Sequence, residues 1–333
     1  MGAPRKLMTA GAMAAAMATA GALAVKARGN SIAATTDDRL DPLLSPPEGI
    51  EHHRIPTFDG GTVHVAERGS GPAVVLLHGV TLQWDVWSPL LALLGDDHRV
   101  LAWDMRGHGE SQAGDEGVSL QAVGTDLVTA LSHLDVDSAV VVGHSMGGMA
   151  LGRTYVDHRA AAQRRIAHGM FLATSAAPMH PVAHDPDTIR HEAAVLVATG
   201  GMGNRFRYGW PEGNLSRVIL RRAFGVDATA AAVEQLRQMM ADMAPDSLTD
   251  ASHAIVKHDI RDTVGASGIE SSVVTGTLDR LTPPRHGRML ADSLGAQTEL
   301  HILEGIGHQV MQEDPWTLAD LIRERAVTPS GVG

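Results

Sequence analysis

The sequence contains no cysteine among its 333 residues. Disulfide bonds, thiol nucleophiles and thiolate-bound metal sites are therefore all excluded for this chain. The absence of cysteine is compatible with any cellular compartment, so it gives no information about where the protein works.

Positive charge is also scarce. The chain has 27 Lys and Arg against 38 Asp and Glu, which gives a formal net charge of -11, and no stripe of basic residues is visible. Nucleic acid is therefore not expected as a partner. The 18 histidines form no His-Glu-x-x-His or similar ligand spacing, so no metal site is expected. Apolar residues make up 44% of the chain, as is usual for a globular protein with a buried core.

The first 34 residues differ in character from the rest. An uncharged run at 7–25, rich in Ala, Met and Gly, has basic residues on both flanks. Its length suits a signal sequence, with a small-x-small cleavage pattern at 22–24, or a membrane anchor. We expect residues 1–34 to direct export or membrane attachment; the alternative is a leader that stays on a cytoplasmic protein. The Pro- and Asp-rich stretch at 35–50 is expected to be a linker.

From residue 51 onward, short apolar runs alternate with helical patterns. The first two runs are joined by Asp59-Gly60-Gly61, which predicts a hairpin. Strands are expected at 54–58, 62–68, 73–77, 100–103, 140–142, 169–173, 271–275 and 298–303. Helices are expected at 84–94, 120–134, 215–224, 228–243, 284–294 and 315–323. This alternation predicts a mainly parallel sheet with helices on both faces and a ligand site at the carboxyl ends of its strands.

A nucleophile motif is the centre of this pattern. The apolar run at 140–142 ends in Gly143-His144-Ser145-Met146-Gly147-Gly148, and a helix-compatible stretch follows. A serine between a strand and a helix, with glycines on both sides, is typical of a strained turn that exposes a nucleophilic hydroxyl. The same glycines are also compatible with an ordinary tight turn, and the preceding strand favours the nucleophile.

Two further residues complete a catalytic set in chain order. Asp279 follows the expected strand at 271–275, and His308 follows the strand at 298–303. Serine, then an acid, then histidine at strand ends is the order found when a hydrolase builds its triad on a parallel sheet. Asp104 is a second carboxylate after a strand, and Thr174 and Ser175 stand after the strand at 169–173.

The chain resembles serine hydrolases of the α/β-hydrolase fold, of the esterase and lipase type. The motifs that carry the resemblance are Leu77-His78-Gly79-Val80, Asp104 to Ser111, Gly143 to Gly148, Gly276-Thr277-Leu278-Asp279 with Pro283, and Gly307-His308 with Glu313 and Pro315. The resemblance runs from about residue 55 to 324 and is specific for fold and catalytic machinery rather than for substrate.

The resemblance implies a fold and a domain plan. We expect an α/β class protein with an eight-stranded, mainly parallel sheet, formed by a core domain of residues 51–175 and 264–326. A helical cap over the active site is expected at 176–263. The turn that begins at Asp104 is used structurally in this family, which favours Asp279 as the catalytic acid.

The resemblance also implies site residues. Ser145, Asp279 and His308 are expected to form the catalytic triad, and the backbone N–H groups of Val80 and Met146 the oxyanion hole. Candidate substrate contacts are His78, Gly79, Trp84, Met179 and Met240. For Trp84 and the methionines, core packing is the competing interpretation.

The expected function is hydrolysis of carboxylic esters with short to medium acyl chains, through an acyl-serine and without a cofactor or metal. The expected partner is a small-molecule ester. A cofactor-free perhydrolase or a C–C bond hydrolase would use the same triad, and a hydrolase-like binding protein is the non-enzymatic alternative. A serine at position 145 argues against the epoxide hydrolase and haloalkane dehalogenase branches, which need a carboxylate there. The sequence leaves the oligomeric state open.

Overall fold

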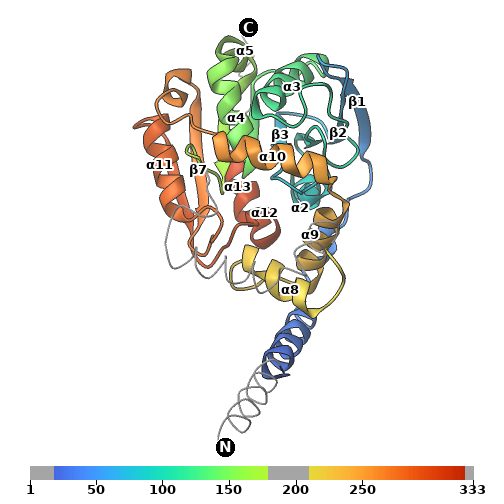
Figure 1. Ribbon diagram of the computed structural model, residues 1–333. Helices are drawn as coiled ribbons and strands as arrows, with labels where there is room; N and C mark the ends of the chain where they lie inside the picture. Colours follow the sequence, from blue (N-terminus) through green and yellow to red (C-terminus); the bar gives the residue numbers. More distant parts are fainter. Residues whose placement is uncertain (1–18, 179–209, 327–333) are drawn as a thin grey trace, which may run out of the picture.

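A single eight-stranded sheet runs through the computed structural model, which describes residues 19–178 and 210–326 (Figure 1). The strand order is β1-β2-β4-β3-β5-β6-β7-β8. The strands β1 and β2 form an antiparallel hairpin at one edge, and every pairing from β4 to β8 is parallel. Their bounds are β1 Glu51–Pro56, β2 Thr62–Arg68, β3 Ala73–Leu77, β4 Arg99–Asp104, β5 Ala139–His144, β6 Ile166–Leu172, β7 Glu270–Gly276 and β8 Glu299–Leu303. The expected mainly parallel sheet is confirmed.

Both faces of the sheet are covered by helices because successive strand residues are apolar and point to opposite sides. In β3, Val74 and Leu76 belong to one buried cluster, and Val75 and Leu77 belong to another. The helices that pack on the first side are α2 (Ser88–Leu94) and α13 (Pro315–Arg325). Those on the second side are α3 (Leu120–His133), α4 (Met146–Asp157) and α11 (Pro284–Leu294).

Helices also fill the segment between β6 and β7, where the sequence predicts a cap. We call the described part of this segment, residues 176–178 and 210–263, the helical insertion. Residues 179–209, which include Met179, lie outside the described residues. The elements of the helical insertion are α8 (Asn214–Leu220), the 3₁₀ turn η3 (Arg221–Ala223), α9 (Ala230–Asp242) and α10 (Pro245–Lys257). The remaining short elements are η1 (Asp41–Leu44), η2 (Trp84–Trp87), α5 (Arg159–Arg165), η4 (Val264–Ser267) and α12 (Val310–Glu313).

The predicted helix at 84–94 is divided into two elements. A 3₁₀ turn at Trp84–Trp87 precedes α2, which begins at Ser88. Pro89 lies in the first turn of α2, where its missing N–H costs no hydrogen bond. The same proline cannot donate to a carbonyl of the preceding turn, so a continuous α-helix does not form.

The segment at 35–50, expected as a linker, packs on the domain instead. Leu40 and Leu44 are 3% and 6% exposed, and both belong to the cluster under α2. The side-chain amide of Gln235 in α9 donates to the carbonyl of Leu44 at 3.1 Å. The linker prediction failed because three leucines in a polar stretch give no periodic signal, yet the burial of Leu40 and Leu44 fixes the segment.

A helix at 19–33 extends from the body beside α8 (Figure 1). Its carboxyl half is anchored to the body. The side-chain amide of Asn214 in α8 donates to Lys26 O at 3.3 Å, Ile32 is 4% exposed, and the carbonyl of Thr35 accepts a hydrogen bond from Ala230 N–H at 2.8 Å. Among the helices of residues 19–178 and 210–326, none combines the length and the apolar character needed to cross a bilayer.

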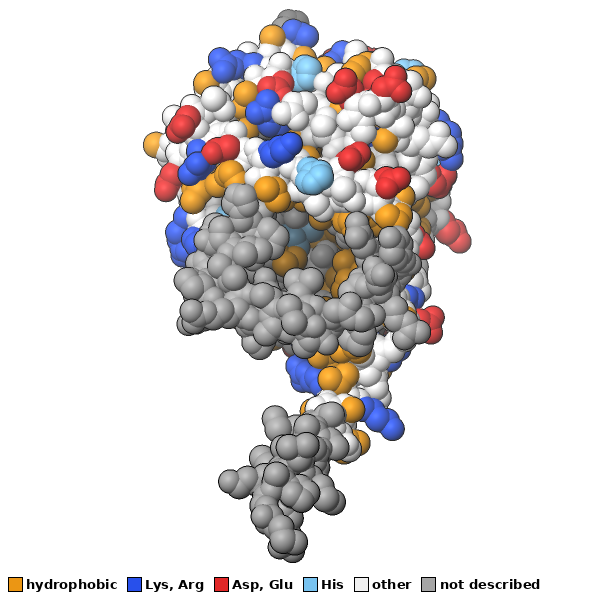
Figure 2. Space-filling view, in the orientation of Figure 1, with side chains coloured by type: hydrophobic (Ala, Val, Ile, Leu, Met, Phe, Trp, Pro, Cys, Tyr) orange, Lys and Arg blue, Asp and Glu red, His pale blue; other side chains and the backbone are white. Residues whose placement is uncertain are grey.

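Charged and hydrophobic side chains are distributed differently on the face of the molecule seen in Figure 2. Acidic and basic side chains are interspersed over the upper part of this face, and they are not gathered by sign. Hydrophobic side chains of described residues are visible near its centre (Figure 2). Mixed charge of this kind suits a surface that stays in water.

Candidate active site

Ser145 lies at the sharp turn between β5 and α4. Its backbone has φ 51° and ψ -115°, a conformation that costs a non-glycine residue free energy and is typical of a functional constraint. The turn is held by two hydrogen bonds: Ser145 N–H donates to Leu172 O at 2.9 Å, and Thr174 Oγ1 donates to Ser145 O at 2.7 Å. Ser145 is partly exposed, whereas His144 and Met146 are each only 1% exposed. The turn therefore presents the serine from an otherwise buried segment.

Close backbone approach explains the glycines around this serine. A Cβ on Gly147 would lie 2.4 Å from the carbonyl oxygen of Leu77, and one on Gly143 would lie 2.6 Å from that of Gly147. Real Cβ atoms do not come so close, so neither position accepts a larger residue without moving the turn. The sequence prediction of a strand, a tight turn and a helix is confirmed at this point.

Asp279 and His308 form a buried, hydrogen-bonded pair. Nδ1 of His308 lies 2.9 Å from Oδ2 of Asp279, and the two residues are 4% and 3% exposed. Because a carboxylate only accepts, Nδ1 carries the proton and donates it. Nε2 of a neutral His308 is then left with its lone pair, which is the tautomer that a general base requires.

The carboxylate of Asp279 stays ionised in this buried position. Burial alone would raise its pKa, but the adjacent His308 and hydrogen bonds from Thr282 outweigh that effect and lower the pKa to about 2. The backbone N–H groups of Leu281 and Thr282 each donate to Oδ1 at 2.8 Å, and Thr282 Oγ1 donates to Oδ2 at 2.7 Å. Asp279 is therefore both oriented and kept charged.

The loop that carries His308 is tied to the helical insertion. His308 N–H donates to Ala223 O at 2.7 Å. The carboxylate of Glu313 accepts from the N–H groups of Gly307 at 3.1 Å, Gln309 at 3.2 Å and Gly225 at 2.5 Å. Glu313 thus fixes the end of the loop and binds it to the insertion.

The Ser145 turn and the His308 loop are in direct contact. The ring of His144 lies 4.8 Å from the ring of His308, centroid to centroid, and His144 Nε2 donates to His308 O at 2.9 Å. Desolvation by burial lowers the pKa of His144 well below its ordinary value, so this ring is neutral. Among the described residues, no hydrogen bond joins the Ser145 hydroxyl to His308.

The loop after β3 approaches the same serine. A Cβ on Gly79 would lie 3.1 Å from Cβ of Ser145 and 2.9 Å from Nδ1 of His144. The backbone N–H groups of Val80 and Met146 donate to no acceptor within 19–178 and 210–326. Two free donors beside a serine are the arrangement that an oxyanion site needs.

His78 holds the loop after β3 rather than facing a ligand, which corrects its expected role as a substrate contact. Its side chain is fully buried, and both ring nitrogens are bonded to backbone. Nε2 accepts from Met105 N–H at 3.0 Å, so Nδ1 carries the proton and donates to Gly79 O at 2.7 Å.

The other two candidate contacts that the structure describes lie on apolar surfaces. Trp84 is half-buried, and its ring packs edge-on against His52 and His64 at centroid distances of 5.6 and 6.1 Å. Met240 in α9 is half-buried and packs against the cluster under α2. Neither observation tests a contact with substrate.

Sequence reasoning missed Thr282 and the part played by His144. Thr282 Oγ1 lies 3.2 Å from Nδ1 of His308 in addition to its bond with Asp279. The only signal for Thr282 is local, since an aspartate that accepts from N–H groups two and three residues later is a common turn. For His144, no spacing in the sequence indicates that its ring reaches the histidine loop.

Comparisons with known proteins agree with this architecture. A model of the Alpha/beta hydrolase family matches residues 74–320. Bifunctional epoxide hydrolase 2 of Sus scrofa is 41% identical over 115 residues, which are 33% of this chain; the match spans only 20% of that enzyme's length. An uncharacterized protein of Mycobacterium tuberculosis is 25% identical over 285 residues, covering 80% of each chain.

Solved structures of other proteins are similar to this chain as well. The structure of a thermophilic esterase from Thermogutta terrifontis superposes with a TM-score of 0.66 at 25% identity, covering 82% of this chain and 97% of that one. Because the family match spans most of the sheet and includes Ser145, Asp279 and His308, this chain is a hydrolase that belongs to the alpha/beta hydrolase family.

Proposed function

We propose that the protein is a serine hydrolase that cleaves carboxylic esters of short to medium acyl chains. The observation that carries the proposal is the buried Asp279–His308 pair, 2.9 Å apart, beside a strained and partly exposed Ser145. All three residues follow strands of the parallel part of the sheet, at their carboxyl ends.

The proposed reaction follows from the tautomer of His308. Ser145 Oγ attacks the ester carbonyl carbon while His308 Nε2 takes the hydroxyl proton. The tetrahedral intermediate then collapses, and the alcohol leaves with that proton, which gives an acyl-serine. Water attacks the acyl-serine in the same way and releases the acid. Asp279 stabilises the imidazolium in both halves, and no cofactor is needed.

The Ser145–His308 hydrogen bond is proposed to form when substrate binds. Catalytic hydrogen bonds are often absent or long in ligand-free proteins and tighten in the complex. Rotation of the Ser145 side chain towards the adjacent His308 loop requires no change of fold, because His144 already joins the two loops.

The oxyanion of the intermediate is proposed to bind the N–H groups of Val80 and Met146. Both donors are free of other described acceptors, and Met146 begins α4, whose N-terminal end carries partial positive charge. Removing one such donor typically costs about 3 kcal/mol of transition-state stabilisation.

The similarity to epoxide hydrolases does not extend to this nucleophile. That branch of the family needs a carboxylate at the position of Ser145, and the matched segment covers a third of this chain. A serine hydroxyl activated by His308 suits acyl transfer, which is why an ester is proposed as the substrate.

The helical insertion is proposed to form a cap whose apolar side chains receive the acyl chain. Met240 is half-buried in α9, where a flexible thioether can adapt to a ligand. Each buried methylene contributes about 0.8 kcal/mol, until the chain meets the wall of the pocket. The rival idea is that Met240 only packs against its neighbours and that the pocket is small.

The test is a series of p-nitrophenyl esters of increasing acyl length. We expect kcat/KM to rise from acetate to a short or medium chain and then to fall, and Met240→Ala to alter that profile. Ser145→Ala is the matched control and should remove turnover. A profile that falls steadily from acetate and is unchanged by Met240→Ala would refute the acyl pocket.

Two other activities would use the same residues. Peracid formation from acetate and peroxide, faster than ester hydrolysis, would identify a perhydrolase; a C–C bond hydrolase would cleave activated diketones but not esters. Failure of every activated ester with folded protein would favour a binding protein instead.

Export or membrane attachment through residues 1–34 is a separate proposal, supported by the uncharged run at 7–25. Fractionation of cells that express the full chain or a chain beginning at residue 35 tests it. Equal solubility of both in the cytosol, with an intact N-terminus on the full chain, would refute it.

A further inference from the structure

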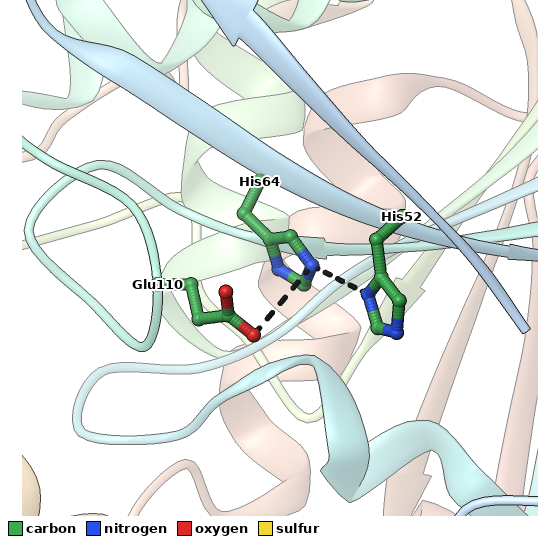
Figure 3. A group of neighbouring side chains, drawn as sticks. All are labelled: His52, His64 and Glu110. Carbon is green, nitrogen blue, oxygen red and sulfur yellow. Dashed lines mark hydrogen bonds and ion pairs between the residues drawn. The ribbon is translucent and has the colours of Figure 1, made fainter.

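Three ligand-type side chains meet at the hairpin edge of the sheet (Figure 3). Nδ1 of His52 lies 2.8 Å from Nε2 of His64, and Oε1 of Glu110 lies 3.9 Å from the same Nε2. One nitrogen or oxygen from each of the three residues lies within 4.8 Å of the other two. This is the one such group of three within 19–178 and 210–326.

Strand pairing brings the two histidines together. In the antiparallel register of β1 and β2, His52 is opposite Ala66 and His64 is opposite Arg54. Opposite residues share a face, so His52 and His64 are diagonal neighbours on one side of the hairpin. Glu110 reaches them from the loop after β4.

His64 is already oriented as a metal ligand. Its Nδ1 lies 2.8 Å from Oδ2 of Asp104, and the two side chains are 1% and 0% exposed. Asp104 is an acceptor on both oxygens, since it also receives the N–H groups of Trp84 and Glu110 at 2.7 and 3.0 Å. Nδ1 of His64 therefore carries the proton, and the lone pair on Nε2 faces His52. A carboxylate behind a histidine in this way fixes the ring and raises its basicity towards a metal.

We propose that His52, His64 and Glu110 bind one divalent transition-metal ion of the zinc class. Two imidazoles and one carboxylate favour zinc, cobalt or nickel over calcium or magnesium. Oε1 of Glu110 binds the ion, while Oε2 keeps its 2.6 Å ion pair with Arg54. Water completes a tetrahedral shell.

Both exposed ligands must move for such a shell: Oε1 of Glu110, now 3.9 Å from His64 Nε2, must come closer, and His52 must move away. Two nitrogens bound at about 2.0–2.1 Å in a tetrahedral zinc site lie about 3.3 Å apart, against the observed 2.8 Å between His52 and His64. His52 is exposed at the edge of the sheet and can turn outwards by that amount. Nδ1 of His52 can bind a metal only through its lone pair, so the proton that it carries moves to Nε2 when the metal binds.

The site is distinct from the proposed esterase centre and has a structural consequence. It joins β1 and β2 to the loop that carries Glu110, so binding should stabilise the folded chain and raise Tm. Its existence does not depend on the activity of Ser145.

Metal binding to the tag-free full chain, freed of metal by a chelator, tests the proposal. Cobalt(II) is added and the visible spectrum followed; zinc affinity is measured by competition with a chromophoric chelator. His53→Ala is the matched control, because His53 is the next residue on β1 and pairs with Glu67 at 3.0 Å instead.

We expect one equivalent of cobalt with the intense absorption of a four-coordinate ion, and a zinc-dependent rise in Tm. His52→Ala and Glu110→Gln should each weaken zinc binding by more than about tenfold, because loss of even an outer-shell partner of a ligand typically costs that much, with unchanged circular dichroism. His53→Ala should bind as the parent chain does. Absence of binding at micromolar metal, or full binding by His52→Ala, would overturn the assignment.

Discussion

Ser145 combines backbone strain with exposure, and its neighbours hold it in that state. The bond from Thr174 Oγ1 to its carbonyl and the bond from its N–H to Leu172 keep a left-handed φ that a free turn would abandon. At the residue scale, the proposed nucleophile thus depends on fixed backbone as well as on its side chain.

The choice of Asp279 over Asp104 as catalytic acid gives a paired prediction. Asp279→Asn should lower kcat by about 10⁴-fold, because an amide neither holds the required His308 tautomer nor stabilises the imidazolium. Asp104→Asn should act on stability instead, since its oxygens accept from His64, Trp84 and Glu110. Steady-state kinetics and thermal unfolding of both variants make the comparison.

The expected pattern is a folded, nearly inactive Asp279→Asn and an active Asp104→Asn with a lower Tm. A well-folded Asp104→Asn that has lost turnover would reverse the choice of acid.

Residues with local signals could be predicted from the sequence, and residues joined only by the fold could not. Ser145, Asp279 and His308 each follow an apolar run, so the sequence alone indicates that they lie at strand ends. The bond of Glu313 to Gly225 and the contact of Thr282 with His308 join separate loops. His52 and Glu110 meet His64 only because β1 pairs with β2 and the loop after β4 returns to them, and no ligand spacing exists to reveal it.

At the element scale, the loop after β3 carries Val80, the proposed oxyanion donor, next to Gly79. Gly79→Ala would place a Cβ 2.9 Å from Nδ1 of His144 and 3.1 Å from Cβ of Ser145, so the loop must move away from the nucleophile. We expect kcat to fall by about 10²-fold, the size of losing one oxyanion donor, with little change in Tm. Ester kinetics and calorimetry measure the two effects.

Gly21→Ala is the control, because no atom lies within 4 Å of a Cβ at that position. An unchanged kcat in Gly79→Ala would mean that the loop after β3 supplies no oxyanion donor.

Elements with a large buried face were predicted well, and those without one were not. The strand at Thr62–Arg68 and the helix at Pro284–Leu294 agree with the sequence prediction because their apolar patterns are strong. The helix α10 was missed; its apolar residues are few, and Ala251 is the one that is buried. The 3₁₀ turn before α2 was not predicted. The apolar pattern continues through this turn, although Pro89 interrupts the α-helix there.

At the scale of the whole molecule, buried neutral histidines set the response to acid. Burial lowers the pKa of His108 to about 3 and those of His168 and His258 to about 4, from an ordinary value of 6.5. Below pH 6.5 the unfolded chain takes up these protons and the folded chain does not, so stability falls as pH falls. Burial and nearby Asp104 raise the pKa of Asp85 to about 6, and burial also raises the pKa values of Asp126 and Glu313, which opposes the trend. The three histidines are joined by His78 and His144, whose pKa values burial also lowers.

We therefore expect Tm to be highest near neutral pH and to fall steadily between about pH 6.5 and 4.5, as measured by calorimetry. His168→Gln removes one of the histidine contributions, so its Tm should decline less steeply than that of the parent chain. A Tm that stays flat or rises over this range would contradict the account.

Covalent labelling of Ser145 tests the central claim most directly. A fluorophosphonate reacts with a serine only where a base and an oxyanion site activate it, so the purified full chain should take up one equivalent and lose its esterase activity in proportion. Peptide mass spectrometry should find the adduct on Ser145, and Ser145→Ala should remain unlabelled. An adduct on another residue, or an active enzyme that stays unlabelled, would contradict the assignment of Ser145 as the nucleophile.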